Sequence, residues 1–212
     1  MHDIAAIVQA LQQELETKSS VRDHTLGRAR ELTRLCANSI RATHRAESKQ
    51  AEALLRDAKR LASEMREAVA EHQDLYFAGY TQDALKEFAE ATITYAVVND
   101  RPVPDPLSLG VEPPAYLNGL AEAMGELRRH VLDLIRKDLM QRAEHILAVM
   151  DEVYWLLVTV DFPDAVTGGL RRNTDMVRGV LERTRADLTT AQEQALLREA
   201  LAQFEARLDA RQ

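Results

Sequence analysis

Glutamates at helical spacing are the residues of this 212-residue chain whose chemistry stands out first. Glu87 and Glu90 lie three residues apart in KEFAE, and Glu122 and Glu126 lie four apart in a later segment. Residues three or four apart share one face of a helix, so each pair presents its two carboxylates together. Carboxylate oxygens bind hard divalent cations such as Mg²⁺ and Mn²⁺. The same pattern also occurs on solvated faces, so a metal site requires that the two helices pack side by side.

Arginines form a second set with a possible role in binding. Arg34, Arg41 and Arg45 recur at spacings of seven and four residues, with His44 beside them. Guanidinium groups fork to phosphate oxygens, so an arginine stripe on a helix can follow a nucleic-acid backbone. The same arginines, close to acids such as Glu31, also fit a helix that is only kept soluble, and both interpretations stay open.

Net charge first argues against a nucleic-acid partner, because 27 Lys and Arg face 34 Asp and Glu, for a net charge of −7. The charges are segregated, however. Residues 22–60 hold ten Lys or Arg against five acids, and residues 61–100 hold eight acids against two bases. A block of about +5 is therefore followed directly by a block of about −6, so the average hides a basic segment that suits phosphate.

Helices are expected throughout, because the first 101 residues contain no proline and apolar residues recur at helical spacing. No window alternates convincingly as a strand. We expect an all-α protein of about seven helices and no sheet, organised as one domain over residues 1–212.

Proline and glycine mark the expected boundaries. Asn99-Asp100 before Pro102 predicts the end of a helix that begins at about Thr81, and residues 100–114 form the one expected long loop. A nearly all-apolar stretch, Ile146–Val160, predicts a central core helix or a subunit interface. Beyond the loop we expect helices over residues 114–136, 138–160 and 164–188, the last weakened at Gly168-Gly169, and a terminal helix begun by a capping box of Thr190 and Glu193.

Several classes of protein are excluded. The single cysteine, Cys36, cannot close an intrachain disulfide, and no Cys/His cluster resembles a zinc site. No P-loop is present, because no lysine follows Gly168-Gly169 in the required register. The longest apolar stretch is shorter than the ~20 residues that cross a bilayer, and polar residues interrupt residues 1–15. We therefore expect a soluble, cytoplasmic protein with no membrane partner.

Four segments together resemble the translin family, in particular its TRAX branch and the translin-like proteins of prokaryotes. The segments are RELTRLCANSIRATHR, KEFAEA, YLNGLAEAMGELRR and DFPDAVTGGLRRNTDMVRGVLERTRADLT. The likeness covers nearly the whole chain. It implies an all-α subunit of about seven helices, a helical bundle that assembles into a closed oligomeric barrel. The expected assembly is a homo-octamer that binds single-stranded RNA or DNA.

The resemblance also implies roles for the acids. TRAX-type subunits are Mg²⁺-dependent endoribonucleases, and KEFAEA is similar to their QEYVEA motif, whose two glutamates are catalytic. Glu87 and Glu90 are therefore the implied catalytic residues and metal ligands. YLNGLAE is similar to YLLGVAD, which makes Glu122 the third, with glutamate where TRAX has aspartate. Glu126 matches the acid of the GEL that follows and completes the implied Mg²⁺ or Mn²⁺ ligands. The implied nucleic-acid contacts are Arg34, Arg41, His44 and Arg45.

The leading hypothesis is a homo-oligomeric, metal-dependent endoribonuclease that cleaves single-stranded or unpaired RNA inside its shell, through a water activated by carboxylate-bound Mg²⁺. Two alternatives remain open. One is a non-catalytic translin-type oligomer that binds single-stranded RNA or DNA. The other is a helical scaffold protein without nucleic-acid activity, in which both charge blocks are solvated faces.

Overall fold

The computed structural model describes residues 3–209, and all the regular secondary structure in this range is helical. The prediction of an all-α fold is confirmed. About seven helices were expected; the described range has nine, because three four-residue helices, α3, α5 and α8, accompany six long ones. Their bounds are α1 Ile4–His44, α2 Ser48–Ala68, α3 Gln73–Tyr76, α4 Gly79–Val98, α5 Pro106–Leu109, α6 Pro113–Arg136, α7 Met140–Val158, α8 Asp164–Thr167 and α9 Leu170–Asp209.

The chain separates into two compact units, one ending at Leu120 and the other beginning at Ala121. The division falls inside α6, which is one continuous helix of 24 residues. The expectation of a single domain over residues 1–212 stays a prediction, and each unit is described by itself.

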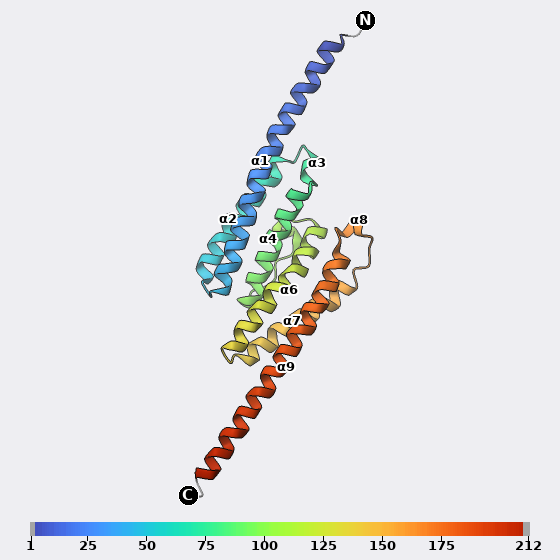
Figure 1. Cartoon of the computed structure of the whole chain (residues 1–212). Helices are drawn as coiled ribbons and strands as arrows, with labels where there is room; N and C mark the ends of the chain where they lie inside the picture. The colour runs from blue at the N-terminus through green and yellow to red at the C-terminus, as the bar shows by residue number, and fades with distance from the viewer. Residues whose placement is uncertain (1–2, 210–212) are drawn as a thin grey trace. The chain divides into compact units, whose positions relative to one another are not determined.

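The first unit is built on α1, α2 and α4, which pack against one another side by side (Figure 1). Leu32 and Cys36 of α1 are fully buried, as are Leu85 and Ile93 of α4. These positions follow the 3.6-residue period, so one face of each helix enters the core. The amino-terminal turns of α1 extend past α2 and α4 and are exposed on all sides.

The carboxyl end of α4 lies where the sequence predicts it. The helix ends at Val98, and the side-chain amide of Asn99 donates to the carbonyl oxygen of Tyr95 at 2.9 Å. Asp100 then adopts a left-handed conformation with φ of 52°, which turns the chain out of the helix. The turn also ties α4 to α2, because the Ser48 hydroxyl donates to the Asn99 amide oxygen at 2.7 Å.

The proline-rich segment is more ordered than the expected loop, since it contains α5. Asp105 caps this short helix by accepting from the backbone N–H of Ser108 at 2.9 Å. The Tyr116 hydroxyl donates to the carbonyl oxygen of Pro104 at 2.8 Å, and the Tyr76 hydroxyl donates to Glu112 at 2.7 Å. These bonds fix the segment that leads into α6, and so fix where α6 begins.

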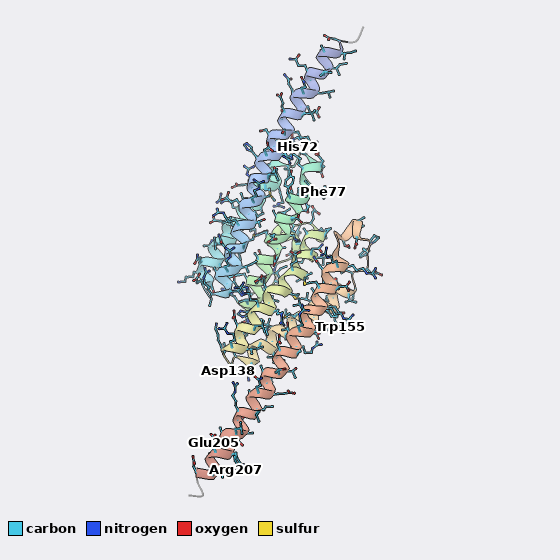
Figure 2. The ribbon with its side chains drawn as sticks, in the orientation of Figure 1. His72, Phe77, Asp138, Trp155, Glu205 and Arg207 are labelled. Carbon is cyan, nitrogen blue, oxygen red and sulfur yellow. The ribbon has the colours of Figure 1, made fainter. Side chains whose placement is uncertain are left out.

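The second unit contains α7 and α9, which pack together, with α8 beside the start of α9. Ile146 and Met150 of α7 are buried, whereas Trp155 is 62% exposed and projects from the helix (Figure 2). The helix therefore buries one side only and is not a central core helix. No helix within residues 3–209 has the length and apolar character that a membrane span requires.

Helix α9 corrects one expectation. Gly168 and Gly169 have φ of 61° and 84° and interrupt the helix, as predicted. The predicted capping box at Thr190 and Glu193 is wrong, because α9 runs without a break from Leu170 to Asp209. A cap stabilises a helix only where the helix starts, and no proline or glycine stops this one before Thr190.

Candidate carboxylate site

Helix α4 presents Glu87 and Glu90 next to a buried surface. Phe88 and Ala89 between them are almost fully buried, while the two glutamates are half-buried. The burial follows from the helical period. Residues on the α4 face that packs on α1 and α2 recur every three to four positions, and the acids lie between them in the sequence. Both carboxylates are therefore held on a well-packed helix.

Glu122 of α6 joins the two glutamates of α4. Each of the three residues offers a carboxylate oxygen, and these oxygens all lie within 4.8 Å of one another. Of the residues that the structure describes, Glu126 does not belong to this group, although the sequence set it beside Glu122. We call Glu87, Glu90 and Glu122 the carboxylate triad.

The triad fits a hard divalent cation. Its donors are oxygens only, which Mg²⁺ and Mn²⁺ prefer, and three converging acids repel one another unless positive charge or protons come between them. Mg²⁺ keeps several waters and takes few carboxylates, so three half-buried acids leave room for water and a phosphate oxygen. That the triad binds metal stays a prediction.

The thiol of Cys36 on α1 is affected by the negative charges of the α4 glutamates. Burial raises the pKa of the Cys36 thiol, and the negative charges of Glu87 and Glu90 raise that pKa further. The thiol is fully buried and not part of a disulfide. It therefore stays protonated near neutral pH and supplies neither a thiolate ligand nor a nucleophile.

The predicted nucleic-acid contacts lie on a different side of α1. At 100° per residue, Arg34, Arg41 and Arg45 project about 160°, 140° and 180° from the direction of Cys36, and all three are exposed. His44 is half-buried and lies about 80° from that direction. The arginines therefore face away from the side of α1 that carries Cys36.

The three arginines differ in how strongly they are engaged within the chain. Arg45 forms a bidentate ion pair with Glu47, at 2.9 and 2.7 Å, which raises the pKa of Arg45 and lowers that of Glu47. Arg41 donates to the amide oxygen of Asn38 at 2.6 Å, and Arg34 lies 3.5 Å from Glu31. Arg41 thus keeps its positive charge without a carboxylate partner in these contacts, whereas Glu47 offsets the charge of Arg45.

A cavity of about 720 Å³ in the second unit holds none of the predicted site residues. It lies between α7 and α9, and its polar lining mixes both signs of charge. Its lining includes Tyr154, Phe162, Asp164, Arg171, Asp175 and Arg178. Among the described residues, the group of three convergent carboxylates lies outside this cavity, so the candidate site is placed at the triad.

Sequence reasoning missed Gly119. This glycine lies inside α6, where glycine is about 1 kcal/mol less favourable than alanine. An unfavourable residue inside a predicted helix is the sequence signal that points to a close contact there. A Cβ atom placed there would lie 2.6 Å from the carbonyl oxygen of Lys86 on α4. The contact brings α6 against the turn of α4 that carries Glu87 and Glu90.

Residues 3–209 form an all-helical fold that carries three convergent carboxylates, and comparison with known proteins supplies the family. No protein-family model matches the chain. It is 33% identical over 192 residues to the uncharacterized protein MJ0175 of Methanocaldococcus jannaschii, a match over 88% of this chain and 83% of that protein.

Solved structures of named proteins also match this chain. A complex of AfC3PO with duplex RNA and a crystal structure of AfC3PO are each 32% identical to this chain, with TM-scores of 0.83 and 0.82. Both matches cover 89% of this chain and 98% of the other. Apo-NeC3PO, at 20% identity and a TM-score of 0.80 over 87% of this chain and 96% of its own, shares the fold. The chain belongs to the C3PO/translin family, which confirms the resemblance seen in the sequence.

The position of Cys36 predicts how stability depends on pH. The pKa of the thiol is raised above its ordinary value of 9.0 in the folded protein, so above pH 9 the unfolded chain releases a proton that the folded chain keeps. Stability is therefore lost as pH rises. Urea titrations in metal-free buffer at pH 8, 9 and 10 should show the wild type losing up to about 1.4 kcal/mol per pH unit more than Cys36→Ala. Parallel pH profiles for the two proteins would contradict the raised pKa.

Proposed function

We propose that this protein is a homo-oligomeric, Mg²⁺-dependent endoribonuclease that acts on single-stranded or unpaired RNA inside its assembly. The observation that carries the proposal is the carboxylate triad, whose oxygens lie within 4.8 Å of one another. A bound Mg²⁺ or Mn²⁺ lowers the pKa of a coordinated water and neutralises charge on a phosphate. Glu87, Glu90 and Glu122 would hold that ion, while Glu126, one helical turn beyond Glu122, lies outside the triad and stays a predicted ligand.

The chain's own residues do the remaining work in this proposal. Phe88 and Ala89, which are nearly fully buried, anchor the α4 turn on which two of the carboxylates sit, so the acids keep their orientation. Burial and the charges of Glu87 and Glu90 keep the pKa of the Cys36 thiol raised, so the thiol stays neutral and the carboxylates are the only anionic donors that we assign. The free thiol also suits a reducing compartment, and we propose a cytoplasmic location.

RNA as the partner is supported by the related AfC3PO, which has been solved in complex with duplex RNA. We propose that Arg34, Arg41, His44 and Arg45 contact the phosphate backbone, with Arg41 the strongest single contact because no carboxylate offsets its charge in the contacts described above. We propose RNA as the partner, and binding of single-stranded DNA, which the translin resemblance also implies, stays a prediction.

The direction of the arginines supports an assembly of several copies. Arg34 and Arg41 face away from Cys36, and the charges of Glu87 and Glu90 act on the Cys36 thiol. An RNA strand that contacts both the arginines and the carboxylates would therefore pass around α1 or bridge two copies of the chain. Exposed apolar side chains support the second route, since such patches mark interaction surfaces. They include Ile4, Ile7, Val8, Leu11 and Leu15 of α1, Trp155 and Leu156 of α7, and Leu197, Leu201, Phe204 and Leu208 of α9. We propose a closed homo-octamer.

Replacing two ligands should separate cleavage from binding. Glu87→Gln/Glu90→Gln keeps the size of both side chains and removes two negative charges, so Mg²⁺-dependent cleavage of labelled RNA should fall by at least about a thousandfold. RNA retention on a native gel should stay or increase. The substrates are single-stranded RNA and a duplex with an unpaired bulge, each with Mg²⁺ or with EDTA.

The matched control is Glu64→Gln/Glu67→Gln on α2, which has the same three-residue spacing and lies outside the triad. It should cleave like the wild type. Cleavage that survives in the Glu87/Glu90 variant, or that EDTA leaves unchanged, would contradict the enzyme. Binding without any cleavage by the wild type would favour the non-catalytic oligomer, and no binding at low salt would favour the scaffold protein.

The arginine stripe predicts a change in salt dependence. Arg41→Ala should weaken RNA binding and reduce the slope of log K against log salt by about one counterion, because a phosphate contact is lost. Arg56→Ala on α2 is the control, since that arginine is already paired with Glu52 at 3.3 Å. Fluorescence anisotropy between 50 and 300 mM KCl measures both slopes. An unchanged slope for Arg41→Ala would exclude this residue from the phosphate contacts.

A further inference from the structure

Helix α6 touches the backbone of α4 at Gly119. A Cβ atom at this position would lie 2.6 Å from the carbonyl oxygen of Lys86, 3.0 Å from the Cβ of Ala89 and 3.1 Å from the amide nitrogen of Glu90. Two of these three atoms belong to the backbone, so a side chain at residue 119 cannot be accommodated by a rotamer change. Only glycine permits this approach of the two helices.

The contact lies at the carboxylate triad. Residues 86–90 form the turn of α4 that carries Glu87 and Glu90, and Glu122 follows Gly119 by three residues, on the same side of α6. Any change in separation between α6 and α4 at Gly119 therefore moves Glu122 relative to the other two acids. The helix also contains Gly125, around which an added Cβ would meet nothing within 4 Å.

We propose that Gly119 is a positioning residue, which sets the size of the cation that the triad accepts by holding α6 against the backbone of α4. This inference rests on the proposed function, because it assumes that the triad binds a divalent cation. Gly119 itself touches neither the ion nor the substrate. Its role is to bring Glu122 close enough for a small ion.

The size argument comes from coordination chemistry. Mg²⁺ requires oxygens at about 2.0–2.1 Å in a nearly ideal octahedron, whereas Ca²⁺ accepts oxygens at 2.3–2.6 Å in flexible geometry. The 2.6 Å contact is about 0.8 Å shorter than an ordinary van der Waals contact, so an alanine forces the helices apart by a comparable amount. A widened triad loses Mg²⁺ and Mn²⁺ before it loses Ca²⁺.

The test compares Gly119→Ala with Gly125→Ala on the same helix. Mn²⁺ binding to the full-length protein is followed by the electron paramagnetic resonance signal of the free ion, and Mg²⁺ and Ca²⁺ are then titrated as competitors. In Gly119→Ala the affinity for Mn²⁺ and Mg²⁺ should fall by at least about tenfold, and the affinity for Ca²⁺ by less than about threefold. Gly125→Ala should bind all three ions like the wild type.

Two results overturn the inference in different ways. A folded Gly119→Ala that binds Mn²⁺, or discriminates Mg²⁺ from Ca²⁺, like the wild type contradicts the positioning role while leaving the metal site intact. A wild type that binds no Mn²⁺ overturns the metal site and the positioning role together. General destabilisation alone does not change the Mg²⁺/Ca²⁺ ratio, so the ratio separates positioning from folding.

A second comparison lowers the steric load of Gly119→Ala by removing one of its three close contacts. In an Ala89→Gly background the contact to the Ala89 Cβ is absent, but the added methyl group still meets the Lys86 carbonyl oxygen. Ala89→Gly/Gly119→Ala should therefore bind Mn²⁺ at least about fivefold more weakly than Ala89→Gly alone. Equal affinities for these two variants contradict the proposal.

Discussion

Three carboxylates gathered within 4.8 Å repel one another, and the helices that carry them must resist that repulsion. Two unit charges about 5 Å apart at an effective dielectric constant of about 20 repel by about 3 kcal/mol. Packing holds these helices in place: Phe88 and Ala89 anchor the α4 turn in the first unit, and Gly119 lets α6 lie on the backbone of that turn. This convergence of carboxylates is the feature of the fold that suits a divalent cation.

The triad is linked to residues that lie outside it. Cys36 is buried beside two of the acids, and their charges raise the pKa of its thiol, so the effect of the cluster reaches α1. The anchoring of Tyr116 on Pro104 and of Tyr76 on Glu112 fixes the segment that delivers α6 to α4. Our proposal of an RNA-cleaving enzyme uses this one concentration of negative charge, together with the arginines on the opposite side of α1.

The helices themselves could be predicted from the sequence, because periodicity and breakers are local. Asn99-Asp100 ended α4 as expected, and Gly168-Gly169 separated α8 from α9. The capping signal at Thr190 failed because the same residues are tolerated inside a helix that has already started. Local sequence signals therefore predict most helix ends correctly, and they predict one helix start, at Thr190, where the helix continues instead.

The candidate site could be predicted only in part. Spacing alone showed that Glu87 and Glu90 share a face, but the meeting of Glu122 with them depends on how α6 packs, which no local pattern encodes. The departure of Glu126 from the group has the same origin. The resemblance to the translin family supplied the pairing of the two motifs before the geometry did. Gly119 was visible as an unfavourable residue in a helix, but its reason lies in the backbone of α4.

The central claim is that Glu87, Glu90 and Glu122 together bind one divalent metal ion. Locating that ion is the most direct test. Crystals of the full chain grown with MnCl2 and measured at the manganese absorption edge would show where the ion binds. The account predicts an anomalous peak at bonding distance from carboxylate oxygens of all three glutamates. Density maps that place Mn²⁺ only elsewhere, or that show no anomalous peak at the triad at millimolar Mn²⁺, would contradict it.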